Sequence, residues 1–121
     1  MIRNSVIYIL KLENNNFYVG TSSNLPRRLK DHFNHRGSVW TKKHKPIQVI
    51  DILEHKDIFT EDNTTKKLMF LHGINHVRGG SYCRTKLTSC DITTLTKEYR
   101  SAFNLCFKCG ESHLSYSCKK I

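Results

Sequence analysis

Four side chains near the start of the sequence have the chemical types needed to act on a phosphodiester. Tyr8 and Tyr18 supply two phenols, Arg28 supplies a guanidinium, and His32 supplies an imidazole. A guanidinium offers a planar fork of donors to phosphate oxygens, and an imidazole exchanges a proton near neutral pH. A phenol has a pKa near 10, so it needs a neighbouring cation before it can act as a base. Each residue alone is usually structural or solvated, so the interpretation requires that they converge.

The first element that must position them is a strand hairpin over residues 5–20. Its apolar residues suit a buried strand, and three consecutive asparagines form the turn. With the strands paired around this turn, Tyr8 faces Gly20 and lies diagonally across from Tyr18. Gly20 then leaves space beside Tyr8 where a phosphate can approach.

A helix follows the hairpin and carries the other two groups. Leu25, Leu29 and Phe33 recur at four-residue spacing and predict a stripe that faces the core. Arg28 and His32 are also four residues apart, so they share one side of the same helix.

The rest of the chain predicts an α+β fold with a small three-stranded antiparallel sheet flanked by helices. After a basic loop at 38–45, we expect a third strand at 47–54, a helix from 60 to 73 with Leu68 and Leu71 buried, and a third helix from 91. The expected domains are 1–90, a helix at 91–104 that packs on or links to it, and a short cysteine-rich segment at 105–121.

The charge distribution indicates a polyanionic partner. The net charge is +10, and half of the ten acidic residues lie within residues 46–62, so an acidic island interrupts a basic chain. The sequence shows no run of about 18 apolar residues and no secretory signal. We therefore expect an intracellular protein of the cytoplasm or nucleus with no membrane partner.

The order of these motifs resembles the GIY-YIG endonuclease family over residues 5–72. Val6-Ile7-Tyr8 matches the first motif, with Val6 in place of the usual glycine, and Tyr18-Val19-Gly20 matches the second. Residues 24–32 match the helix motif, and 37–46 match the link into the third strand. The resemblance implies hydrolysis of phosphodiester bonds in DNA with one divalent metal, Mg²⁺ or Mn²⁺. The small layout resembles family members of large DNA viruses and phages, which would place it in an infected host cell.

The family resemblance also implies a role for each residue of the site. Tyr8 would be the general base or would position the attacking water, and Tyr18 would support it by hydrogen bonding. His32 would assist proton transfer, and Arg28 would hold the scissile phosphate. A glutamate on the second helix would hold the metal.

Three acidic residues are candidates for that metal ligand. Glu61 is preferred because it stands in the first turn of the helix, in line with Thr65. Asp62 lies about 100° further round and should point elsewhere. Glu54, at the end of the third strand, is the alternative.

The C-terminal segment has the spacing of a zinc site. Cys106, Cys109, His113 and Cys118 form the pattern C-x2-C-x3-H-x4-C. Three thiolates and one imidazole suit a closed tetrahedral Zn²⁺ site, which would be structural here. The segment resembles the zinc knuckle family, whose pattern has four residues before the histidine, so ligation by His113 stays open.

Several basic and aromatic residues are candidates for nucleic-acid contact: Lys42, Lys43, Arg78, Phe107, Lys108, Tyr116 and Lys119. Phe107 and Tyr116 would stack on unpaired bases, and the basic residues would contact phosphates. Alternatively, both aromatic side chains pack the knuckle against the preceding helix. Arg78 stands in an Arg-Gly-Gly sequence, which is more often simply a turn.

The sequence therefore predicts a metal-dependent DNA endonuclease that acts on branched or duplex DNA, with the zinc knuckle contributing nucleic-acid binding. The alternative is a non-catalytic nucleic-acid-binding protein that retains the fold. A third possibility, a protein directed to RNA or to other single-stranded nucleic acid, depends only on the knuckle.

Overall fold

The computed structural model describes residues 5–102 of the chain. The chain divides into two compact units, residues 1–86 and residues 87–121. The first unit holds the sheet and the helices that cover it.

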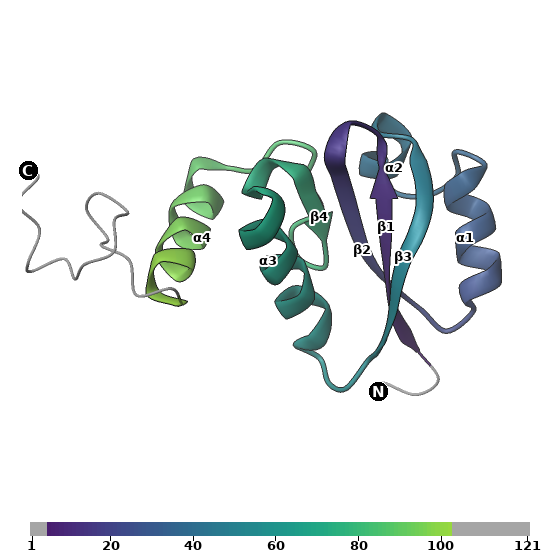
Figure 1. Ribbon diagram of the computed structural model, residues 1–121, viewed down its shortest axis with the longest axis horizontal. Helices are drawn as coiled ribbons and strands as arrows, with labels where there is room; N and C mark the ends of the chain where they lie inside the picture. The colour runs from purple at the N-terminus through teal and green to yellow at the C-terminus, as the bar shows by residue number, and fades with distance from the viewer. Residues whose placement is uncertain (1–4, 103–121) are drawn as a thin grey trace, which may run out of the picture. The chain divides into compact units, whose positions relative to one another are not determined.

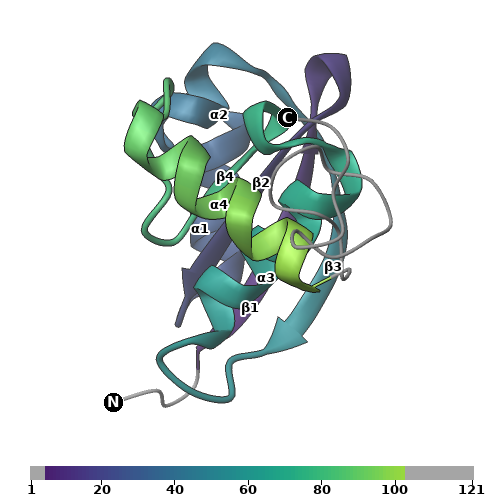
Figure 2. The same ribbon diagram turned by 90° about the vertical axis from the view of Figure 1, so that its left-hand side faces the viewer.

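The sheet has four strands in the order β3-β1-β2-β4 (Figures 1 and 2). They are β1 (Val6–Leu12), β2 (Asn16–Ser22), β3 (Pro46–Glu54) and β4 (Val77–Gly79). β1 pairs antiparallel with β2 and β3, and β4 pairs in parallel with β2. The three predicted strands form and pair antiparallel. The prediction missed the fourth, parallel strand, because the three-residue β4 carries too little pattern to be recognised.

The predicted hairpin register is confirmed. Tyr8 lies opposite Gly20, and Leu10 lies opposite Tyr18. The turn is a short 3₁₀ segment in which Asn14 adopts a left-handed backbone conformation, as asparagine tolerates well.

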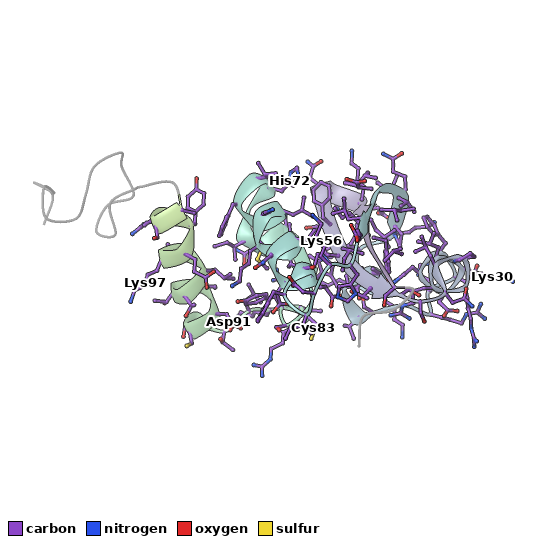
Figure 3. The ribbon with its side chains drawn as sticks, turned by 90° about the horizontal axis from the view of Figure 1, so that it is seen from below. Lys30, Lys56, His72, Cys83, Asp91 and Lys97 are labelled. Carbon is purple, nitrogen blue, oxygen red and sulfur yellow. The ribbon has the colours of Figure 1, made fainter. Side chains whose placement is uncertain are left out.

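Helix α1 (Leu25–Phe33) packs on one face of the sheet. Asn24 caps its first turn, and Leu25 and Leu29 pack against a buried cluster of Tyr8, Leu10, Leu12 and Trp40. Lys30 points away from the sheet on the outer side of α1 (Figure 3). Phe33 was predicted to be buried but is 41% exposed, and His32 is buried instead. At 100° per residue, position 32 lies closer to the direction of Leu25 than position 33 does.

The predicted basic loop contains a short helix, α2 (Val39–Lys43). Ser38 caps its N-terminus by accepting a hydrogen bond from the backbone of Thr41. Trp40 is buried, and its indole N–H donates to the backbone carbonyl of Phe17 at 2.9 Å. These contacts tie α2 to the hairpin.

Helix α3 (Thr60–His72) lies on the opposite face of the sheet from α1 (Figure 1). Its buried residues are Thr65 and Met69, whereas Leu71, predicted to be in the core, is 73% exposed. The helix ends at Gly73, as predicted, and a 3₁₀ turn (Ile74–His76) leads into β4.

The second unit contains helix α4 (Ser89–Ala102), whose first turn is capped by the Thr88 hydroxyl group. Leu95 is its buried residue. No helix among residues 5–102 has the length and apolar character that a membrane crossing requires.

Candidate active site

The two tyrosines meet on the face of the sheet that α1 covers. Their ring centroids lie 6.2 Å apart, and the Tyr8 side chain is completely buried. A Cβ at Gly20 would overlap the Tyr8 phenol and would lie 2.8 Å from the Tyr18 ring. Glycine is therefore required at position 20, because any side chain there would displace Tyr8.

Helix α1 brings His32 into direct contact with this pair. The His32 Nε2 atom lies 2.7 Å from the Tyr8 hydroxyl oxygen, and its ring centroid lies 5.1 Å from that of Tyr18. The pKa of His32 is lowered to about 4. Burial is the largest cause, the positive charge of Arg28 also lowers the pKa, and the charge of Asp31 partly opposes both. The imidazole is therefore neutral near pH 7 and can accept a proton.

Arg28 stands one helical turn before His32 and approaches both phenols. Burial raises the pKa of Tyr8 and of Tyr18 above the ordinary phenol value, and the nearby guanidinium of Arg28 partly opposes this rise. For Arg28, burial acts to lower the pKa, but the two phenols outweigh it and raise the pKa. Arg28 hydrogen-bonds to both phenols. A guanidinium has five N–H donors, so donors remain for an anion.

Glu61 reaches the same region from the first turn of α3. Its negative charge contributes to the raised pKa of both Tyr8 and Tyr18, which places it near the phenol pair. Burial, reinforced by the charge of Asp62, raises the pKa of Glu61 itself. In the part of the chain that the structure describes, Glu61 and Arg28 do not pair directly, so each is available to a third group.

Two buried polar atoms lie beside Glu61. Thr21 and His55 both act on Glu61 and lower its pKa. Yet Thr21 Oγ1 and His55 Nδ1 are buried and have no hydrogen-bond partner of good geometry within the described residues. Buried polar atoms of this kind ordinarily have a partner, such as water or an ion.

The residues present fit an Mg²⁺ or Mn²⁺ ion held by Glu61. Among residues 5–102, no group of three or more His, Cys, Asp or Glu side chains forms a metal cage. Magnesium is commonly bound through one or two carboxylates, with water and phosphate oxygens as the other ligands. Glu61 would be that carboxylate, and the metal would need the substrate to complete its ligands.

The other two acidic candidates lie elsewhere. Asp62 accepts hydrogen bonds from the backbone N–H of Ser81 at 2.8 Å and from its hydroxyl group at 2.7 Å, so Asp62 holds the turn after β4. Glu54 is exposed and lines a cavity of about 480 Å³ with Lys56 and Asp57.

Comparison with known proteins agrees with this geometry. The family model of the GIY-YIG catalytic domain matches residues 4–65. The chain belongs to the GIY-YIG family. It is also similar to the UPF0213 protein YazA of Bacillus subtilis (strain 168), with 30% identity over 64 residues. That match covers 53% of this chain and 57% of the relative, so this GIY-YIG chain spans only a little over half of the relative's length. No solved structure matches the chain.

The GIY-YIG match includes all five residues predicted to be catalytic. The structure brings them together from two strands and two helices of the first unit, β1, β2, α1 and α3. The predicted nucleic-acid contacts differ in outcome. Lys42 and Lys43 are exposed on α2, as a phosphate contact requires. The predicted zinc ligands and the other predicted contacts lie outside the described residues: Cys106, Cys109, His113, Cys118, Phe107, Lys108, Tyr116 and Lys119.

The structure corrects the prediction for Arg78. Its guanidinium is buried and donates to the backbone carbonyls of Ile74, Val77, Arg84 and Thr85 at distances from 2.6 to 3.1 Å. It also lies 4.6 Å from the ring centroid of Trp40. Arg78 has no donor directed to solvent, so it holds the fold together and does not contact a phosphate.

Sequence reasoning missed the residues that support the site from α2. Thr41 is buried, and its hydroxyl oxygen lies 3.1 Å from His32 Nδ1. Ser38 holds Thr41, and it also lies close enough to Tyr18 to lower that residue's pKa. The sequence signal for them is a serine three residues before a threonine, which is typical of a helix cap.

Proposed function

We propose that this GIY-YIG domain is a metal-dependent endonuclease that hydrolyses phosphodiester bonds in DNA. One observation carries the proposal. A cation, Arg28, and an anion, Glu61, approach the same two phenols without pairing with each other. A bound phosphate and a divalent metal ion would together satisfy both charges.

Arg28 would hold the scissile phosphate. Its hydrogen bonds to Tyr8 and Tyr18 use only part of its five N–H donors, and its charge is retained at all relevant pH values because its pKa is raised. A guanidinium placed beside a phosphoryl group stabilises the negative charge that develops in the transition state.

Tyr8 and His32 would carry the proton of the attacking water. The water oxygen forms the new bond to phosphorus and gives one proton to the Tyr8 oxygen. The Tyr8 hydroxyl proton moves in turn to His32 Nε2 across the 2.7 Å hydrogen bond. The bond from phosphorus to the leaving oxygen breaks, that oxygen takes a proton from solvent, and His32 later releases its proton to solvent.

This route keeps Tyr8 from having to exist as a free phenolate. Burial holds the pKa of Tyr8 above its ordinary value, so the ligand-free site contains a neutral phenol. When a phosphate balances the charge of Arg28, the repulsion that lowers the pKa of His32 also falls. Substrate binding therefore makes His32 a better proton acceptor. A metal ion on Glu61 would supply Lewis-acid stabilisation of phosphate and leaving-group charge.

Glu61 and its neighbour Asp62 allow a matched test of the metal role. We expect Glu61→Gln to lower Mg²⁺-dependent nicking of supercoiled plasmid by at least about 100-fold and to weaken Mn²⁺ binding measured by calorimetry. Asp62→Asn removes the same charge from a carboxylate that is bound to Ser81 and acts on Glu61 only through its charge, so it should lower the nicking rate far less than Glu61→Gln. Nicking by Glu61→Gln at the wild-type rate would leave a non-catalytic DNA-binding protein as the better explanation.

The net charge of +10 supports a nucleic acid as the partner. Cleavage of a matched panel of linear duplex, branched DNA, single-stranded DNA and hairpin RNA would define the substrate. Cleavage confined to RNA would contradict the proposed DNA specificity.

We further propose that Cys106, Cys109, His113 and Cys118 bind one structural Zn²⁺ and that this segment adds nucleic-acid affinity. Zinc content measured by mass spectrometry should be one ion per chain and should be lost in Cys109→Ser. His113→Asn would show whether the histidine is a ligand despite its shortened spacing. A wild-type chain without zinc would contradict the proposal.

A further inference from the structure

A continuous chain of hydrogen bonds runs from the Tyr8 phenol into the first turn of α2. The Tyr8 hydroxyl group contacts His32 Nε2 at 2.7 Å, and His32 Nδ1 contacts Thr41 Oγ1 at 3.1 Å. The Thr41 hydroxyl group donates in turn to the backbone carbonyl of Ser38 at 3.0 Å. The side chains of Tyr8, His32 and Thr41 are each at most 1% exposed, so these hydrogen bonds are shielded from solvent.

The groups at the two ends of this hydrogen-bond series determine which atom donates at each step. The Ser38 carbonyl is only an acceptor, so the Thr41 hydroxyl hydrogen points to it. The Thr41 oxygen then accepts from His32 Nδ1–H and from the Ser38 hydroxyl group, whose oxygen lies 3.1 Å away. At the other end, the positive charge of Arg28 attracts the lone pairs of the Tyr8 oxygen and turns the hydroxyl hydrogen toward His32. The reversed orientation would leave the Tyr8 hydrogen without an acceptor among the described residues.

The start of α2 is shaped to hold this arrangement. Ser38 Oγ accepts a hydrogen bond from the Thr41 backbone N–H at 3.2 Å, which fixes the position of Thr41 in the first turn. A Cβ at Gly37 would overlap His32 Nδ1 and would lie 2.7 Å from Thr41 Oγ1. The absence of a side chain at Gly37 is what allows the imidazole and the hydroxyl group to approach.

We infer that Thr41, held by Ser38, is a positioning residue that fixes His32 in the Nδ1–H tautomer, so that the unprotonated Nε2 faces Tyr8. The inference rests on the proposed function, because it explains how His32 is ready to accept the proton that Tyr8 passes on. With the opposite tautomer, Nε2–H would donate to the Tyr8 oxygen, and the phenol proton would have no destination.

The tautomer can be read directly in wild-type protein without any activity measurement. Long-range ¹H–¹⁵N NMR spectra distinguish a protonated from an unprotonated ring nitrogen, and His32→Gln identifies which signals belong to His32. We expect wild type to show protonated Nδ1 and unprotonated Nε2. The Nε2–H tautomer in wild type would overturn the inference, even if the chain proves to be an active nuclease.

Two substitutions at Thr41 then connect the tautomer to turnover. Thr41→Val keeps the shape but removes the acceptor, so His32 should change to the Nε2–H tautomer and kcat for plasmid nicking should fall. The expected fall is on the order of 10- to 100-fold, as for other hydrogen-bond partners that orient a functional histidine, with KM unchanged. Thr41→Ser retains the hydroxyl group and should restore both the tautomer and kcat.

The outcomes separate this inference from the proposed function. A tautomer change in Thr41→Val with an unchanged kcat would show that the orientation of His32 does not serve catalysis. A fall in kcat without a tautomer change would show that Thr41 acts only on the fold. Absence of nicking in wild type would remove the proposed function, while the NMR result would still decide the tautomer.

Discussion

Two arginines of this chain, Arg28 and Arg78, are both partly or fully removed from water but have opposite hydrogen-bonding environments. Arg28 hydrogen-bonds to the two phenols of the site and keeps further N–H donors. Arg78 is buried and donates to four backbone carbonyls. The comparison shows that the surrounding acceptors determine the role of a guanidinium. One arginine is left ready for an anion, and the other is committed to the protein.

The same contrast appears in the adjacent acids Glu61 and Asp62. Asp62 accepts two hydrogen bonds from Ser81. Glu61 lies near Thr21 and near the buried His55 Nδ1 atom, which has no hydrogen-bond partner among the described residues. A group that the fold leaves unsatisfied is the one that a ligand can satisfy. In both pairs, the residue predicted to be functional acts on the phenol pair. Its counterpart holds backbone segments of the fold.

The sharpest test of the comparison is to remove the available guanidinium. We expect Arg28→Ala to lower the rate of Mg²⁺-dependent nicking by about 100- to 1,000-fold, the effect of removing one donor to a developing anion. Arg27→Ala is the matched control. Arg27 is exposed, and its replacement removes the same charge from the same helix. Equal losses in the two variants would mean that Arg28 contributes only general charge.

Replacing the buried Arg78 should lower the stability of the fold without changing the catalytic site. Arg78→Met leaves four backbone carbonyls without their donor, so it should lower the free energy of unfolding by about 3 kcal/mol, measured by urea denaturation. Arg84→Met keeps the backbone carbonyl that Arg78 contacts and should have little effect. A stable Arg78→Met protein with impaired DNA binding would reverse the assigned roles.

The buried His32 should make stability sensitive to acid. Its pKa is about 4 in the folded chain and 6.5 in its ordinary state. Between these values the unfolded chain binds more protons, so stability falls as the pH falls from about 6.5 to about 4. Between about pH 7 and pH 4, wild type should lose up to roughly 3 kcal/mol more unfolding free energy than His32→Gln. His35→Gln is the control, because His35 is exposed. Equal acid sensitivity of wild type and His32→Gln would contradict the effect of burial on His32.

The smallest expected effect concerns the exposed lysines of α2. Replacing Lys42 and Lys43 with alanine should lower the magnitude of the slope of log K against log salt concentration by about 2, if each lysine contacts one phosphate of duplex DNA. Lys30→Ala should not change the slope, because Lys30 lies on the outer side of α1 (Figure 3). Fluorescence anisotropy at several salt concentrations would measure both, and an unchanged slope in the double variant would exclude α2 from the DNA-binding surface.

Much of the site was predictable because its positions follow local periodicity. The alternation of strand residues and the asparagine turn place Tyr8 opposite Gly20, and the helical repeat places Arg28 one turn before His32. These relations depend on near neighbours in the sequence, so the sequence pattern contains them.

The rest depended on contacts between distant segments. The burial of Arg78 follows from a three-residue parallel strand and from carbonyls on both sides of it, neither of which has a sequence pattern. The role of Thr41 was missed because α2 is only one turn long. Phe33 was predicted to be buried from spacing alone, but Leu25 and Leu29 align better with His32, whose polar atoms both find partners.

The parallel pairing of β4 with β2 also affects the order in which the site is completed as the chain folds. The hairpin, α1 and α2 are contiguous in sequence, so the phenols, Arg28 and His32 come together through short-range contacts, which form quickly. Glu61 stands on the helix that crosses between β3 and β4, and its placement depends on a distant pairing with a larger entropic cost of loop closure. The half proposed to handle phosphate and protons therefore assembles first, and the carboxylate proposed to bind the metal takes its place last.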